Sequence, residues 1–66
     1  MWRKNPERRC WSRVAPAGFA VVEHVADDGC WLWTVTDSTN GAVHAAGILP
    51  TREAAQEAAQ ARQESL

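Results

Sequence analysis

Two glycine-closed turns on either side of one short segment constrain this chain more than any other feature. The segment is residues 30–36, and the turns are Asp27-Asp28-Gly29 before it and Thr39-Asn40-Gly41 after it. Glycine adopts the left-handed backbone conformation that tight hairpins need, and β-branched and aromatic residues between such turns are typical of strands. The sequence therefore predicts a central strand that is joined by a hairpin to another strand on each side.

The flanking segments complete a fold. Residues 19–26 are rich in β-branched side chains and residues 42–49 form the third strand, while the segment after Pro50 is rich in alanine at helical spacing. Thr51 can cap the first turn of that helix, and Glu53 lies near its positive end. We expect an α+β fold, with a three-stranded antiparallel sheet of two hairpins packed against one C-terminal α-helix.

The turn lengths predict which side chains face the helix. Three-residue loops ending in glycine place Val21 opposite Val35, and Trp33 between Glu23 and Gly47. One face then collects Phe19, Val21, Val25, Trp31, Trp33, Val35, Val43, Ala45 and Leu49. Two-residue loops are the alternative, and they place His24 and His44 in the row of the tryptophans. Because a slip of one residue exchanges the two faces, the larger apolar count favours the three-residue loops.

The helix is expected to cover this face with small side chains. At about 100° per residue, the stripe consists of Ala54, Ala55, Ala58, Ala59 and Ala61. Methyl groups let the helix approach closely, so that the indoles of Trp31 and Trp33 fill the space beneath it. Arg62 falls within the stripe, and we expect its stem to extend past the edge of the sheet.

The N-terminal segment differs in character from the rest of the 66 residues. The chain has a formal net charge of −1, but residues 1–13 carry five basic side chains against the single acid Glu7. Trp2 and Trp11 are interleaved with these cations. We expect two parts, a basic Trp-containing arm over residues 1–14 and a single domain over residues 15–66. Whether the arm is ordered on the domain stays open at this point.

No pattern in the sequence indicates catalysis or a metal. Cys10, His24, Cys30 and His44 are 14, 6 and 14 residues apart, without the close pairs that structural zinc sites use. Ser12 and Ser38 lie outside any nucleophile motif, and the paired aspartates of the first turn are expected to bond their own backbone. We expect no enzyme activity, no cofactor and no metal.

The sequence also predicts a location. No stretch approaches the roughly 20 apolar residues that a membrane-spanning helix needs. Met1-Trp2-Arg3-Lys4 is followed by charged residues rather than by the apolar run of a secretory signal. We expect a cytoplasmic protein without a membrane partner, in which Cys10 and Cys30 remain thiols.

Two surfaces are candidates for binding. On the predicted outer face of the sheet, His24, Leu32 and Ile48 form one row and Val22 lies in the next, and contiguous apolar strips of this kind often bind proteins. Trp11 and Val14 folding back over the strip as a strand or lid is the alternative. The second candidate is the arm, because cations contact phosphates and indoles stack on bases. Its residues are Trp2, Arg3, Lys4, Arg8, Arg9, Trp11 and Arg13.

One stretch resembles known proteins. The pattern Trp31-x-Trp33-x-Val35-x-Asp37, then Asn40-Gly41, Gly47 and Thr51-x-Glu53-Ala54, resembles small βββα proteins of unassigned function in bacterial and phage genomes. The resemblance covers residues 30–60 and implies an accessory protein encoded by a phage or mobile element. The topology is also similar to sheet-reading DNA-binding domains at the N-termini of some phage-type integrases.

These observations give two functional expectations. The first is a small non-enzymatic interaction protein, able to form a homodimer, that inhibits or regulates a host protein complex by binding to it. The second is a nucleic-acid-binding protein that uses the basic arm. The first expectation rests on the outer strip and the absence of catalytic motifs, and the second on the clustering of cations and tryptophans before residue 14.

Overall fold

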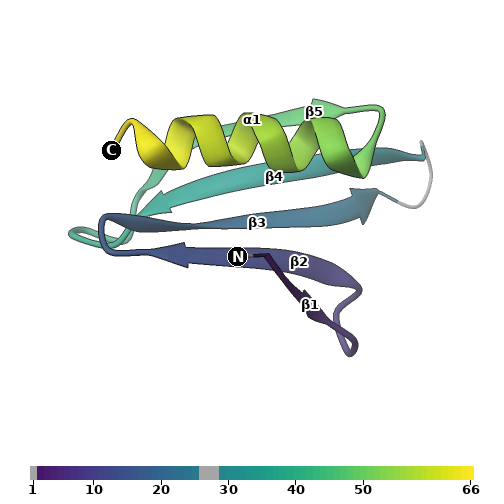
Figure 1. Ribbon diagram of the computed structural model, residues 1–66, viewed down its shortest axis with the longest axis horizontal. Coiled ribbons are helices and arrows are strands. Elements are labelled where there is room, and N and C mark those ends of the chain that lie inside the picture. The colour runs from purple at the N-terminus through teal and green to yellow at the C-terminus, as the bar shows by residue number, and fades with distance from the viewer. Residues whose placement is uncertain (1, 26–28) are drawn as a thin grey trace.

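The computed structural model describes residues 2–25 and 29–66. It contains one antiparallel sheet in which the order of the strands follows the chain, and one C-terminal helix (Figure 1). The strands are β1 (Arg3–Asn5), β2 (Cys10–Ala15), β3 (Gly18–Val25), β4 (Cys30–Asp37) and β5 (Val43–Leu49), and the helix α1 is Arg52–Glu64. The small α+β class is as expected, but the prediction of a three-stranded sheet is wrong, because the sheet has five strands.

The two additional strands come from the segment expected to be an arm. Asn5 closes the turn between them, and its Oδ1 accepts hydrogen bonds from the backbone N–H groups of Glu7 (3.0 Å) and Arg8 (3.3 Å). Arg9 follows with a φ of 51°, in the left-handed region. β2 then pairs with β3 along its whole length. The sequence hid β2 because Arg13 interrupts its apolar side, so that no period-two pattern is visible.

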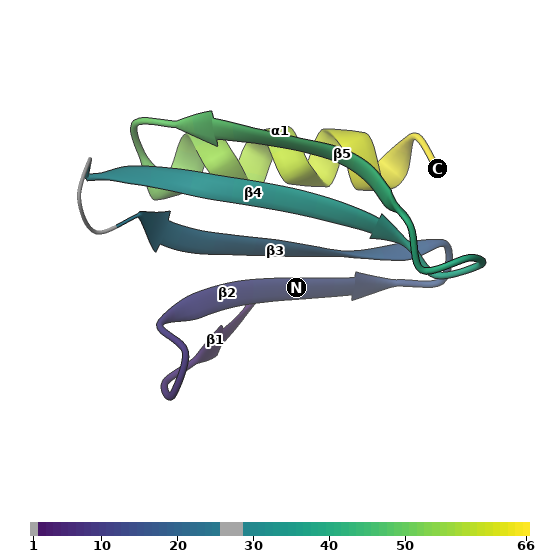
Figure 2. The ribbon, with the colours of Figure 1, turned by 180° about the vertical axis from the view of Figure 1, so that it is seen from behind.

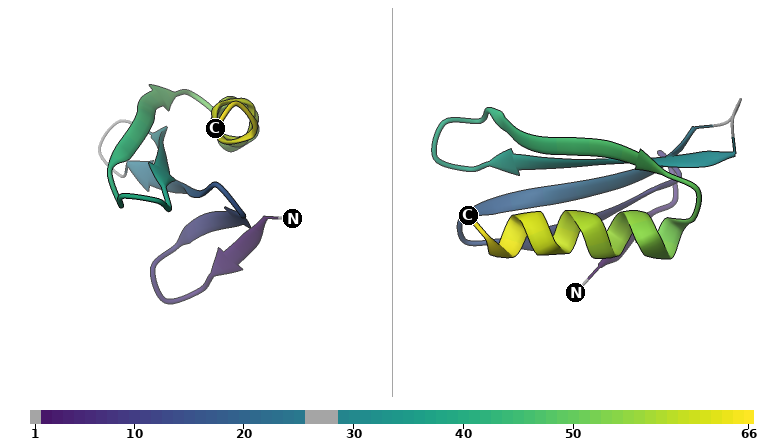
Figure 3. Two further views of the ribbon diagram at one scale, coloured as in Figure 1. Left: turned by 90° about the vertical axis from the view of Figure 1, so that its left-hand side faces the viewer. Right: turned by 90° about the horizontal axis from the view of Figure 1, so that it is seen from above.

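The helix covers one face of the sheet and leaves the other bare. In Figure 1, α1 lies in front of β5 and β4, and Figure 2 shows the same sheet from behind with no other element over it. Seen along the strands, the sheet curves so that α1 and the N-terminal end lie on its concave side (Figure 3, left). We call the side that carries α1 the helix face and the opposite side the outer face.

The helix begins as the sequence predicts. Thr51 is the N-cap, and its Oγ1 accepts a hydrogen bond from the backbone N–H of Ala54 at 3.2 Å. Glu53 lies in the first turn, where the positive end of the helix dipole favours a carboxylate. These features depend on residues close in sequence, and the prediction of this helix start is confirmed.

The buried side of α1 differs from the predicted stripe near its C-terminal end. Ala55 and Ala59 are fully buried as expected, but Ala61 is exposed and Gln63, expected on the polar side, is only 3% exposed. Arg62 is exposed as well. The buried residues Ala55, Ala59 and Gln63 are four positions apart, so they lie along one ridge of the helix. This ridge packs against the sheet and ends at Gln63.

The first hairpin is paired one residue away from the predicted register. Val25 pairs with Cys30, so four residues separate them rather than three. Gly29 has the expected left-handed conformation, with a φ of 66°, and its N–H donates to the carbonyl of Val25 at 3.1 Å. Asp27 and Asp28 of the predicted turn lie outside the described residues. A register shift of one residue moves every side chain of a strand to the opposite face of the sheet.

This shift changes the core. Ala20 and Val22, both 0% exposed, lie on the helix face of β3. They replace three residues that the prediction had placed there: Phe19, Val21 and Val25. Ala20 pairs with Val35, and Val22 pairs with Trp33. These small side chains fit beneath a helix that approaches the sheet closely.

The second hairpin has a loop of the same length but keeps the predicted pairs along most of β5. The N–H of Gly41 (φ 70°) donates to the carbonyl of Asp37 at 2.8 Å, and the N–H of Asp37 donates to the carbonyl of Ala42 at 2.9 Å. A bulge next to Val35 then accommodates one extra residue, His44. Beyond this bulge Trp31 faces Leu49 and Trp33 faces Gly47, as predicted, whereas Val43 is 63% exposed on the outer face.

The core lies between α1 and strands β3 to β5. Its buried members are Ala20, Val22, Trp33, Val35, Ala55 and Ala59. The indole of Trp33 lies against Gly47, where a Cβ atom would be 2.7 Å from the indole Nε1. Trp2, Trp11 and Trp31 are partly buried around this centre. The tryptophans therefore supplement the core of a small chain, as large aromatic side chains can.

Candidate functional site

The outer face carries all the exposed large hydrophobic side chains of the described residues. These are Val14 (82% exposed), Phe19 (41%), Val43 (63%) and Ile48 (61%). Strand pairing places three of them in one row, since Val14 faces Phe19, and both Phe19 and Val43 pair with Thr36. Ile48 lies two rows away, opposite Leu32. The face that lacks a helix is therefore the face with the exposed apolar groups.

Some of the residues predicted for the outer face lie on it, and others lie on the helix face. Leu32 lies there beside Ile48, as predicted. Val22 is buried beneath the helix, and His24 is on the helix face opposite Trp31, so both of these placements were wrong. The one-residue register of the first hairpin explains both errors and also hid Phe19, whereas Val43 was misplaced because of the longer loop and the bulge of the second hairpin. Trp11 and Val14 do form part of an additional strand, but it pairs beside β3 and does not cover the outer face.

The outer face has little charge. Among the described strand residues, its charged side chains are Arg3 on β1 and Glu23 on β3. The rest are apolar residues, cysteines, threonines, serine and asparagine. A face of this composition is suited to contact with protein rather than with a polyanion.

A second site lies on the helix face, between the β1–β2 hairpin and the beginning of α1. It is a cavity of about 380 Å³ lined by Lys4, Pro6, Arg9, Trp11, His24, Trp31 and Arg52. Three of these side chains are cationic and none is acidic. We call it the basic aromatic cavity.

Stacking contacts hold the groups of the basic aromatic cavity in place. The Cζ atom of Arg52 lies 4.5 Å from the ring centroid of Trp11. The rings of His24 and Trp31 are 4.9 Å apart and tilted by 49°. At the exposed rim, Nη2 of Arg52 is 3.4 Å from Oε1 of Glu53. The Nε of Arg52 is buried and has no hydrogen-bond partner among the described residues, so it is an unfilled donor.

Only part of the predicted arm reaches this cavity. Lys4, Arg9 and Trp11 line it, whereas Arg3 points to the outer face and Arg8 lies in the exposed turn. The other lining side chains, Pro6 from the β1–β2 turn and one each from β3, β4 and α1, were not predicted for this site. No local pattern joins them, because they meet only when the hairpin folds beside the helix.

Arg13 instead binds the far end of the helix. Its Nη1 donates to Oε1 of Gln63 at 2.6 Å, and its Nη2 is 3.8 Å from Oε1 of Glu64. The Nε2 of Gln63 donates to the carbonyls of Arg13 (2.8 Å) and Gly18 (3.0 Å). Arg13 therefore connects β2 to α1 and is not available to an external ligand in this arrangement.

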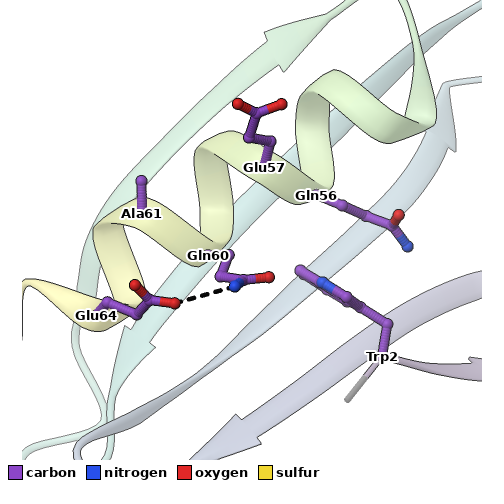
Figure 4. A pocket seen from close by; sticks show the side chains of 6 residues that line it. All are labelled: Trp2, Gln56, Glu57, Gln60, Ala61 and Glu64. Carbon is purple, nitrogen blue, oxygen red and sulfur yellow. Dashed lines mark hydrogen bonds between the residues drawn. The ribbon is translucent and has the colours of Figure 1, made fainter.

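A second cavity, of about 430 Å³, lies between Trp2 and α1 (Figure 4). Figure 4 shows the Trp2 ring directed toward Gln60, while Glu57 points away from it. The Nε2 of Gln60 donates to Oε1 of Glu64 at 3.0 Å. Because the polar groups here are bonded within the helix or directed elsewhere, they do not converge on a ligand. This cavity reflects the packing of Trp2 against the helix.

The described residues show neither a metal-ligand cluster nor a membrane-spanning helix. Within residues 2–25 and 29–66, no three side chains of the kinds that ligate metals come together. The helix of the described chain is too short and too polar to cross a bilayer.

Comparison with known proteins found no match to a protein-family model, to a curated protein or to a solved structure. Two surfaces of the chain have a composition suited to binding: the apolar outer face and the basic aromatic cavity.

Proposed function

We propose that this chain is a non-enzymatic protein-interaction module whose outer sheet face associates with a second copy of itself. One observation carries the proposal: the four exposed large hydrophobic side chains of the described residues share the face that no helix covers. Burying such groups is favourable by about 25 cal/mol per Å² of apolar area. Contiguous exposed apolar surface marks interaction sites.

The charge of the face supports a second copy as the occupant. A two-fold symmetric interface brings the same surface of both copies together, so a strongly charged face would repel itself. Among the described strand residues, this face carries one basic and one acidic side chain, Arg3 and Glu23, on different strands. Antiparallel packing of two copies can bring the arginine of one toward the glutamate of the other.

The size of the face indicates a reversible dimer. The molecule extends 32 Å by 21 Å in the plane of Figure 1, so the projected area of one copy is about 670 Å². A contact between two copies over this area is comparable with the smaller specific interfaces, whose range is about 1,200–2,000 Å² in total. The curvature of the sheet reduces this area further. We expect dissociation on dilution.

The test is sedimentation equilibrium of the wild type and of three glutamate variants. Val14→Glu and Ile48→Glu place a charge on the outer face, and Ala61→Glu is the matched control on the exposed side of α1. We expect the wild type and the control to dimerise, and both outer-face variants to be monomeric. All three sites are exposed, so the free energy of unfolding of the monomer should change by no more than about 0.5 kcal/mol.

Two results would contradict the proposal. A wild type that stays monomeric at concentrations near 1 mM, which corresponds to an association free energy of only about −4 kcal/mol, would exclude the second copy as occupant. An equal loss of dimer in Ala61→Glu would place the contact elsewhere. In the first case a different protein, such as the host protein complex of the first functional expectation, becomes the occupant to examine.

A further inference from the structure

We propose that the basic aromatic cavity binds an unpaired nucleobase together with its phosphate. The ligand can come from single-stranded nucleic acid or from a free nucleotide, since both present the same two groups. The site lies on the helix face, on the opposite side of the sheet from the proposed dimer contact, and goes beyond the proposed function.

The charge of the cavity favours an anion. The chain as a whole has a formal net charge of −1, yet Lys4, Arg9 and Arg52 converge on one cavity whose lining has no acid. Like charges brought together at the edge of a protein repel one another. A phosphate placed among them removes this repulsion and gains charge-assisted hydrogen bonds.

The aromatic side chains favour a planar group beside that anion. Trp11 and Trp31 both line the cavity and are each only partly buried. Bases stack on indoles in proteins that bind single strands, and arginine adds a stacked cation. Arg52 already lies over Trp11, which holds its guanidinium in a fixed orientation.

Arg52 also supplies a specific unfilled contact. Its Nε is buried without a hydrogen-bond partner among the described residues, although the side chain as a whole lines the cavity. A buried donor without an acceptor is unfavourable. Because the Nε is buried, a phosphate or base oxygen in the cavity can accept this hydrogen bond only after the Arg52 side chain shifts toward the cavity.

Other anions fit the lining less well. An acidic peptide supplies carboxylates but no planar group for the two indoles, and a duplex keeps its bases stacked within the helix. A volume of about 380 Å³ is within the range of about 300–1,000 Å³ typical of small-ligand pockets. An unpaired base with one phosphate provides both the charge and the flat surface that this lining can contact.

The experiment is fluorescence anisotropy with a dye-labelled oligothymidylate of about ten nucleotides, a length within the usual site sizes of single-strand binders. Unlabelled competitors are the same oligothymidylate, thymidine monophosphate, the oligothymidylate annealed to its complement as a duplex, and polyglutamate. The full chain is used throughout. Binding is measured at several salt concentrations, because each phosphate contact on a single strand contributes about −0.7 to the slope of log K against log salt.

Two pairs of variants separate the cavity from general charge. Arg9→Gln and Arg52→Gln alter the lining, while Arg8→Gln and Arg62→Gln remove an exposed arginine from the same turn and the same helix. We expect each lining variant to lose affinity about tenfold and to reduce the salt slope by about 0.7, and each control to change affinity less than twofold. Urea unfolding verifies that all four variants fold.

The aromatic contribution has its own test. Trp31→Leu removes a stacking surface and should weaken binding by about five- to one-hundredfold. Trp31→Phe keeps a ring, so it should retain most of the affinity and remains informative if the leucine variant fails to fold. Equal affinity of all three proteins would contradict stacking at this site.

The competition results show which source of ligand the cavity binds and whether the proposal holds. Competition by thymidine monophosphate at the same molar concentration as the oligonucleotide assigns the site to free nucleotides, and competition by the oligonucleotide alone assigns it to single strands. No binding, equal competition by the duplex or by polyglutamate, or equal losses in the control variants would overturn the proposal. Ile48→Glu should bind as the wild type does, so this result is separable from that of the dimer test.

Discussion

At the scale of single residues, Gln63 shows how a polar side chain can occupy the core. It is 3% exposed, and both ends of its amide are bonded: the oxygen accepts from Arg13, and the nitrogen donates to the carbonyls of Arg13 and Gly18. Buried polar groups are tolerated when they are satisfied in this way. The residue thus joins the end of α1 to two strands.

The first prediction concerns this residue. Gln63→Leu keeps a similar volume but leaves two carbonyls without their donor, so we expect a loss of about 1–3 kcal/mol in the free energy of unfolding. Urea denaturation measures it. Gln60→Leu is the matched control, since that amide bonds only to Glu64 within the described residues, and it should change stability by no more than about 0.5 kcal/mol. Equal effects of the two variants would show that the buried bonds contribute little.

The second prediction concerns the contact between Trp33 and Gly47. Alanine is normally better than glycine in a strand, but here its Cβ would lie within 3.0 Å of three indole atoms. Because Trp33 is itself buried, we expect Gly47→Ala to lower the free energy of unfolding by about 1–3 kcal/mol. A double-mutant cycle with Trp33→Phe provides the control, since the smaller ring should relieve most of the loss. A stabilising Gly47→Ala would be incompatible with this close contact.

At the scale of elements, the two hairpins show how one loop type can lead to two outcomes. In both, four residues separate the two residues that close the loop, Val25 and Cys30 or Asp37 and Ala42, and the fourth is a left-handed glycine. In the first hairpin, β3 is displaced by one residue from the predicted register. In the second, the bulge at His44 cancels the displacement, and Trp33 still meets Gly47. Bulges act in this way because they insert one residue on one strand only.

The third prediction tests the bulge. Deleting His44 leaves Val43 and Ala45 in consecutive pairs and makes the ladder regular, so stability should change by less than about 1 kcal/mol. Deleting Ala46 from the same strand can be accommodated only by turning His44 to the helix face in place of Ala45, which should cost at least about 2 kcal/mol. Thermal unfolding of the two deletions compares them directly. Equal losses would mean that the extra residue is not the one at position 44.

At the scale of the whole molecule, the N-terminal segment belongs to the domain. β1 and β2 extend the sheet, Trp2 packs against the core and α1, and Arg13 bonds to the end of the helix (Figures 3 and 4). A chain of 66 residues buries only about 60% of the surface that its unfolded form exposes. Each large side chain added to the core therefore matters to its stability.

The fourth prediction follows from this arrangement. Deleting residues 1–9 removes β1 and Trp2, and we expect the free energy of unfolding to fall by about 1–3 kcal/mol, the amount associated with burial of a large apolar side chain. Trp2→Ala alone should reproduce most of that loss, whereas Lys4→Ala, an exposed residue, should not. Chemical denaturation followed by circular dichroism measures all three. A truncated chain as stable as the full one would show that the segment is an independent arm.

Some features of this protein were predictable from the sequence because they depend on a few neighbouring residues. The Thr51 cap, the left-handed Gly29 and Gly41, the strand over residues 30–36 and the alanine ridge at Ala55 and Ala59 are all of this kind. For the outer face, the same reasoning placed Leu32 and Ile48 correctly. Each of these predictions needs only a turn geometry or a helical period, and both are local properties of the chain.

Only the tertiary structure decided the rest. Which face of β3 is buried depends on one residue of register, and that register is chosen by how Ala20 and Val22 fit beneath α1, not by the apolar count of the strand. Strand β2 could not be predicted from its own pattern, because Arg13 on its buried side is bonded to Gln63, which is fifty residues away in sequence. The basic aromatic cavity forms from β1, β2, β3, β4, α1 and the turn between β1 and β2. Long-range packing selects among locally equivalent alternatives, and a sequence pattern contains no record of that selection.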